Sequence, residues 1–115
     1  MAALARVWLC TEDSALVRAD RIVALAVRTP SGAPLTRMPD GDVRIAIRLD
    51  GATEGFAGVL TCPSEVAPGL LAELARVLTE AGDHPEPCAF VYPERAEGHP
   101  QSWAIASGLP EGWPG

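Results

Sequence analysis

Apolar and polar residues alternate along residues 43–49. The aliphatic residues are Val43, Ile45, Ile47 and Leu49, and Arg44, Ala46 and Arg48 stand between them. A period of two places these groups on opposite faces of a β-strand. The stretch therefore predicts a strand whose aliphatic face is buried and whose arginine face meets solvent or a partner.

Five further segments are rich in strand-forming residues, and they are 6–11, 22–28, 56–62, 88–92 and 101–107. Residues 16–18 are expected to continue the chain back after the first strand. Residues 22–28 are apolar on both faces, which predicts a central position in the sheet. The pair Asp50-Gly51 favours a hairpin turn, and Gly58 predicts a bulge. Residues 93–100, rich in Pro, Gly and Glu, are expected to form a loop.

The period changes after residue 63. Apolar residues then recur at three and four positions, namely Val66, Leu70, Leu71, Leu74, Val77, Leu78 and Ala81. This spacing predicts an amphipathic helix over residues 64–81. Ser64 is expected to cap its start, and Gly82 to follow its end in a left-handed conformation.

These elements predict one α+β domain over residues 1–115, with 109–115 as a loose tail. We expect the order ββββαββ: a two-layer, mostly antiparallel sheet of about five to six strands. The helix would cover the face of Val43, Ile45, Ile47 and Leu49. Residues 29–42 contain three prolines and two glycines, so they predict a long loop of the kind that often carries function.

The composition is acidic, with a net charge of −6. Residues 1–50 hold seven Arg against six acids, whereas residues 51–115 hold two Arg against nine acids. Such a chain repels nucleic acid and anionic lipid, so neither is an expected partner. Every basic side chain other than His is Arg, and Asn is absent, which is typical of a GC-rich bacterial genome.

Three cysteines are widely spaced and form no close pair, so reduced thiols in the cytoplasm are expected. The start of the chain lacks the features of a signal peptide, and no run of about 18 apolar residues predicts a membrane helix. A weak metal alternative combines His84 and Cys88 with Cys62, completed by Cys10 or His99. The second close ligand pair of a structural zinc site is missing, so we expect no metal and no cofactor.

Candidate binding residues are Arg44, Arg48 and Arg28, together with Trp8 and Trp113. Arg44 and Arg48 lie about 13 Å apart along the strand, so they repel each other by only about 0.3 kcal/mol in water. The arginine face is therefore tolerated without a ligand. Arginine is nevertheless frequent at interfaces, because its planar fork pairs with carboxylates. Trp113 near the end of the chain would serve as an anchor if exposed.

No catalytic motif is present and the chain has no Lys, so the sequence favours a non-catalytic binding or assembly protein. Its expected partner is a protein or a second copy of itself, bound through the sheet. Two alternatives remain open. One is a small enzyme or ligand-binding protein with a site between the sheet and the 29–42 loop, using acids and His84 or His99. The other is an acidic regulator or immunity-type protein that binds a basic partner.

Overall fold

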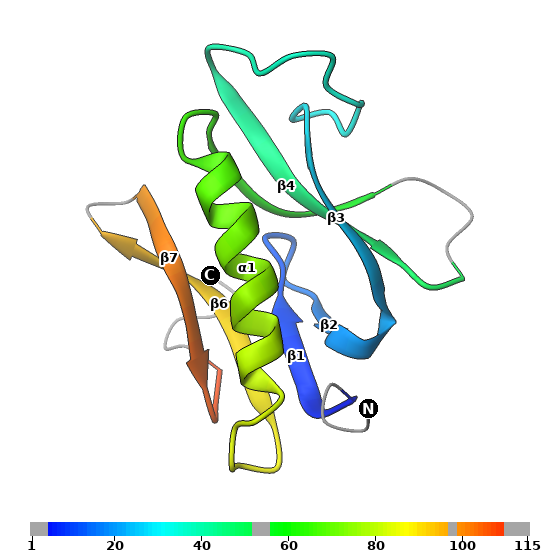
Figure 1. Ribbon diagram of the computed structural model, residues 1–115, viewed down its shortest axis with the longest axis vertical. Helices are drawn as coiled ribbons and strands as arrows, with labels where there is room; N and C mark the ends of the chain where they lie inside the picture. The colour runs from blue at the N-terminus through cyan, green and yellow to red at the C-terminus, as the bar shows by residue number, and fades with distance from the viewer. Residues whose placement is uncertain (1–4, 52–55, 97–98, 110–115) are drawn as a thin grey trace.

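The computed structural model describes residues 5–51, 56–96 and 99–109 (Figure 1). The elements follow the chain as β1 (Val7–Cys10), β2 (Leu16–Arg18), β3 (Ile22–Arg28), β4 (Asp42–Leu49), β5 (Ala57–Pro63), α1 (Ala67–Ala81), β6 (Ala89–Ala96) and β7 (His99–Ala106). The α+β class with a single α-helix is confirmed within these residues. The strands in this described part of the chain number seven rather than five to six, because residues 16–18 form a strand of their own.

The strands form two sheets instead of one. The first has the order β2-β1-β6-β7 and the second the order β3-β4-β5. All neighbouring strands are antiparallel except β1 and β6, which are parallel. A 3₁₀ turn at Ala19–Arg21 leads the chain from β2, at the edge of the first sheet, into β3 of the second. The alternation of apolar and polar residues identifies each strand, but it does not show which strands belong to the same sheet.

Strand β4 has the predicted two-faced character. Val43, Ile45 and Ile47 are fully buried, and Leu49 is partly buried against the same core. The opposite face is less open than expected, because Ala46 in its middle is 1% exposed. The expectation that this whole face meets solvent or a partner is therefore wrong at its centre.

Strand β3 is an edge strand, so the prediction of a central position is wrong. Its residues alternate between Ile22, Leu25 and Val27 toward the core and small alanines on the outer face. A strand that is apolar on both faces is usually paired on both sides. Among the described residues, β3 has a strand neighbour on one side only.

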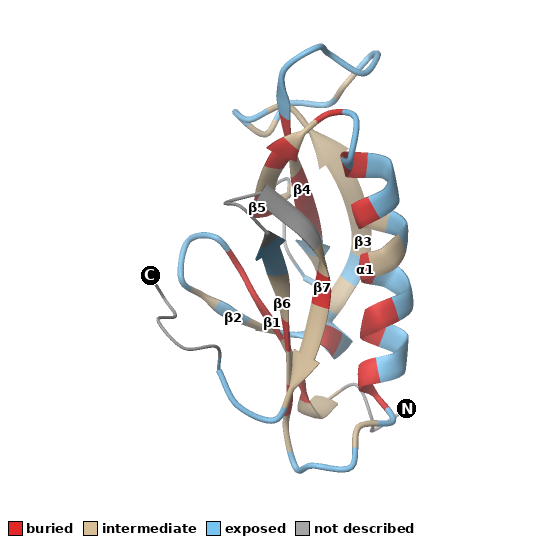
Figure 2. Cartoon of the chain, turned by 90° about the vertical axis from the view of Figure 1, so that its left-hand side faces the viewer, coloured by how far each residue is buried: buried red, intermediate tan, exposed pale blue. Residues whose placement is uncertain are grey.

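Helix α1 begins three residues later than predicted. Val66 occupies the N-cap without a side-chain hydrogen bond, while Ser64 is buried and its N–H donates to the carbonyl of Gly41 at 3.1 Å. Gly82 keeps a right-handed conformation, with φ −61°, so the expected left-handed cap is absent. Figure 2 shows the buried positions of α1 facing the sheets and its exposed positions facing outward.

The hydrophobic core joins both sheets to the helix. It includes Leu9 from β1, Ile45 from β4, Leu74 from α1 and Val91 from β6, and all of these are fully buried. Trp103 of β7 adds two polar ties, since its indole N–H donates to the carbonyl of Leu70 at 2.9 Å and its backbone N–H donates to Glu73 at 2.8 Å. The helix therefore holds the two sheets together.

The last hairpin is longer than the sequence indicated. Strands β6 and β7 extend into the segment 93–100 that was expected to be a loop. Pro93 is tolerated in β6 because β1 pairs with β6 only as far as Val91. Beyond Val91 the β1 side of β6 forms no ladder, so the missing N–H of proline breaks no hydrogen bond there.

Two turn predictions are confirmed. The ladder between β4 and β5 is irregular between Leu60 and Gly58, and Gly51 has φ +81° after Asp50. Within the described part of the chain, no helix combines the length and apolar content needed to cross a membrane.

Candidate functional site

The outer face of the β3-β4-β5 sheet carries Arg28, Arg44 and Arg48, and we call it the arginine face. The strand register places Arg28 beside Arg44, and Arg44 beside Thr61. The next rows contain small residues: Ala26, Ala46 and Gly58 stand side by side, and Ala24 stands beside Arg48. The arginines therefore surround a floor of small side chains.

Arg28 and Arg44 are direct cross-strand neighbours, an arrangement that is unfavourable for like charges. Each guanidinium is held by other groups. The Nε–H of Arg28 donates to the carbonyl of Gly32 at 3.1 Å, and its Cζ lies 4.3 Å from the centre of the Phe56 ring. A cation above an aromatic ring is stabilised by the ring quadrupole. These contacts compensate for the repulsion on the Arg28 side.

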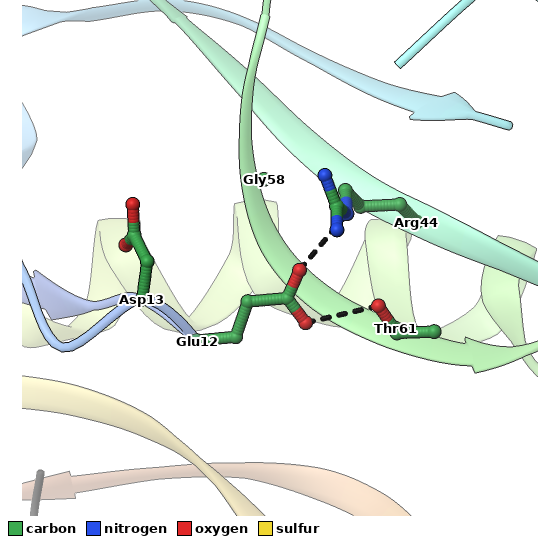
Figure 3. A pocket seen from close by; sticks show the side chains of 5 residues that line it. All are labelled: Glu12, Asp13, Arg44, Gly58 and Thr61. Atoms are coloured by element: carbon green, nitrogen blue, oxygen red, sulfur yellow. Dashed lines mark hydrogen bonds and ion pairs between the residues drawn. The ribbon is translucent and has the colours of Figure 1, made fainter. Parts of the chain in front are cut away.

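Arg44 is paired with Glu12, which lies in the turn between β1 and β2. Its Nε is 2.9 Å from Oε1 of Glu12, and the N–H is not aligned well enough for a hydrogen bond, so the contact is an ion pair. The Thr61 hydroxyl donates to Oε2 of Glu12 at 3.0 Å (Figure 3). The Glu12 N–H donates to the carbonyl of Val59 at 2.9 Å. Glu12 therefore connects the first sheet to β5 of the second.

Gly58 makes room for the Arg44 side chain. A Cβ added at Gly58 would lie 2.5 Å from Cδ and 2.8 Å from Nε of Arg44, which is closer than such atoms approach. A shallow depression of about 310 Å³ opens here, lined by Glu12, Asp13, Arg44, Gly58 and Thr61. Because Glu12 is engaged by both Arg44 and Thr61, this cluster acts first as a tie between the sheets.

Arg48 differs from the other two arginines. It is exposed, it stands beside Ala24, and it makes no hydrogen bond or ion pair with any residue that the structure describes. The alternation of β4 places the exposed Asp42 on the same face at the start of the strand. The face therefore presents one free guanidinium near a paired one, with an acid at its end.

Trp8 is not brought to the arginine face. Trp8 lies in β1 of the other sheet, between Arg18 of β2 and Phe90 of β6, and it is partly buried. Trp113 lies outside the described residues. The structure therefore groups three of the five predicted binding residues and separates Trp8 from them.

Among the described side chains, those of the metal alternative are not gathered into a site. No group of three or more His, Cys, Asp or Glu side chains within the described parts of the chain is placed to hold a metal ion. Cys62 is buried in the core, whereas His84 and Cys88 flank the turn after α1. The side chain of His99 is not among those that the structure describes.

Two thiols are buried, Cys10 and Cys62. Burial raises the pKa of Cys10 to about 11. Burial also raises the pKa of Cys62 to about 11, with smaller contributions from the charges of Asp42 and Glu12. All three cysteines are free thiols. At neutral pH the two buried thiols are protonated and therefore poor nucleophiles.

Sequence reasoning missed two features. Arg6 donates to the carbonyls of Gly82, His84 and Glu86 and so fixes the turn that follows α1, at the far end of the sequence. An apolar groove of about 380 Å³ lies between β3 and α1, lined by Ala19, Ile22, Val23, Ala24, Leu25, Ala75, Leu78 and Thr79. Neither the groove nor the depression at Glu12 is lined by the 29–42 loop. No short motif signals contacts between segments this far apart.

Comparison with known proteins assigns this chain to no family. No protein-family model, no curated protein and no solved structure matches this chain.

Proposed function

We propose that this chain is a small, acidic, non-catalytic binding protein of the bacterial cytoplasm that recognises a protein partner through its arginine face. The observation that carries the proposal is Arg48, an exposed guanidinium without a partner among the described residues. An arginine fork left free on a sheet surface is suited to a bidentate contact with a carboxylate. The three free thiols support a reducing compartment.

The chemistry of the face indicates which partner it fits. Arg44 is already paired with Glu12, and Arg28 is held by Gly32 and Phe56, so Arg48 offers the strongest contact. Ala24 and Ala26 beside the arginines are partly exposed and leave room for a partner, whereas Ala46 is buried and Arg44 lies against Gly58. The whole chain carries a charge of −6, which opposes any strongly acidic partner at long range. We therefore expect a partner that places one or two carboxylates over Arg48 within a mixed surface.

Titration with a short glutamate-containing peptide, followed by backbone NMR shifts, tests this proposal. The expected result is shifts centred on β4 around Arg48, weakened by salt because the contact is an exposed ion pair. Arg48→Gln should abolish the shifts. Arg76→Gln removes the same charge from α1, on another surface, and should leave them unchanged. Equal shifts in both variants, or shifts that map to α1, would refute the assignment of this face.

A further inference from the structure

The edge of β3 that faces away from β4 is open along its middle. No backbone hydrogen bond within the described residues reaches residues 23–27 from that side. At the end of the strand Arg28 forms an isolated bridge with Pro34, which covers that end. The opposite edge of the same sheet is different, because the Glu12 N–H donates to Val59 on β5. An uncovered edge with strong strand propensity tends to pair with another chain.

The open edge continues into the apolar groove under α1. Val23, at the groove, is 59% exposed, more than any other large apolar side chain among the described residues. The ladder between β3 and β4 is irregular between Ile22 and Ala24, and such an irregularity redirects the side chain of the residue it contains. On the helix side, Ala75 and Thr79 are exposed at the rim. An exposed edge and an exposed groove thus form one surface.

We propose that this surface binds a second copy of the same chain, with the two β3 strands paired antiparallel about a two-fold axis near Ala24. The sequence of β3 supports the second copy as the occupant. A strand that is apolar on both faces fits a central position, and the dimer places β3 at the centre of a six-stranded sheet.

The facing side chains are complementary. A two-fold axis perpendicular to the sheet keeps the helices of both copies on one face, so Ile22, Leu25 and Val27 of each copy lie on the helix side beside the groove of the other. Pairing centred on Ala24 brings Val23 of one copy next to Leu25 of the other, twice per dimer. The ladder stops short of Arg28, because Pro34 covers that end of β3.

The size of the surface sets the expected strength. The seven residues of β3 span about 24 Å. With the thickness of the sheet and the adjoining helix flank, each copy offers roughly 500 Å², and about 1,000 Å² in total lies at the lower limit for a specific interface. The dimer is therefore expected to be weak, with a dissociation constant in the micromolar range or above. The same axis joins the arginine faces of the two copies into one continuous surface.

Sedimentation velocity of the full chain, from about 5 µM to about 1 mM, tests the inference. The mass should rise from 12.1 kDa to a plateau at twice that value. Val23→Glu and Ala75→Glu alter exposed positions on two different elements and should each weaken association at least tenfold. Val66→Glu changes another exposed apolar residue, at the start of α1, and should leave association unchanged.

Three results would overturn the inference. One is a mass of 12.1 kDa at every concentration, and another is a mass that rises past the dimer without a plateau. The third is a dimer that neither groove variant weakens. This outcome is separate from that of the Arg48 titration, because Val23 and Ala75 lie outside the arginine face and Arg48 lies outside the groove.

Discussion

At the scale of single residues, Gly58 determines how Arg44 packs. The absence of a Cβ lets the arginine cross β5 and reach Glu12. Gly58→Ala should therefore lower the free energy of unfolding by about 1–3 kcal/mol, as overpacking does. Arg44→Ala removes the obstructing side chain, so Gly58→Ala in that background should cost much less. Chemical denaturation of the four proteins measures this coupling. An equal cost in both backgrounds would show that the close approach is not what requires glycine.

The ion pair between Arg44 and Glu12 should contribute little by itself. Both side chains are partly exposed, and such pairs typically contribute less than about 1 kcal/mol. Glu12 also connects the sheets through its backbone N–H, which donates to Val59, and any residue other than proline could make that contact. This is one reason why the sequence did not reveal the cluster.

The thiols should differ in reactivity in the native protein. Cys88 is half-buried, whereas Cys10 and Cys62 are each 2% exposed and have pKa values raised to about 11 by burial. A disulfide reagent at neutral pH should modify Cys88 first, and the other two only as the protein unfolds. Mass spectrometry of digests over time identifies the modified residue. Modification of Cys62 as fast as Cys88 would contradict the burial of Cys62.

The same thiols should make the protein less stable in alkali. A thiol with a pKa of about 11 when folded and 9.0 when unfolded binds its proton more tightly in the folded state. Its contribution is fully present below pH 9.0 and is lost as the pH rises toward 11. The loss is at most on the order of 2–3 kcal/mol per thiol. Urea unfolding between these pH values should show less decline in Cys10→Ala than in the wild type, and an identical decline would contradict this account.

At the scale of elements, α1 holds the two sheets together. Leu74 is fully buried between them, so Leu74→Ala should lower the free energy of unfolding by about 2–5 kcal/mol. Leu74→Asp and Val77→Asp should prevent folding. Ala72 is exposed on the same helix, and Ala72→Asp provides the matched control. Thermal unfolding followed by circular dichroism makes the comparison. Similar losses for Leu74→Ala and Ala72→Asp would contradict the proposed role of the helix.

The positions of the elements could be predicted largely from the sequence. The alternation in β4 and the helical spacing in α1 are local patterns. The structure therefore contains both elements, with boundaries that differ from the predicted ones by up to three residues. The 93–100 segment was mispredicted because Pro93 lies where β1 no longer pairs with β6, a fact of tertiary structure. For the same reason Arg6 could not be connected to the turn after α1.

At the scale of the whole molecule, the sequence indicated the class of fold but not the division into two sheets. That division separates Trp8 from the arginines and leaves β3 at an edge. The apolar character of β3 predicted a central strand, yet β3 lies at the edge of its sheet in a single chain. The proposed dimer would add a strand at that edge and so place β3 in the centre. The wrong prediction for β3 and the proposed dimer therefore both follow from one observation, an edge strand that is apolar on both faces.

Hydrogen exchange of the β3 amides tests this central claim most directly. The amides of residues 23–27 that point away from β4, which alternate along the strand, should exchange slowly at about 1 mM protein, where the dimer forms, and faster at about 5 µM. Amides of the same sheet in β4, which pair within the chain, should be equally protected at both concentrations. Exchange of the β3 amides that is independent of concentration, or a concentration effect confined to another strand edge, would contradict the account.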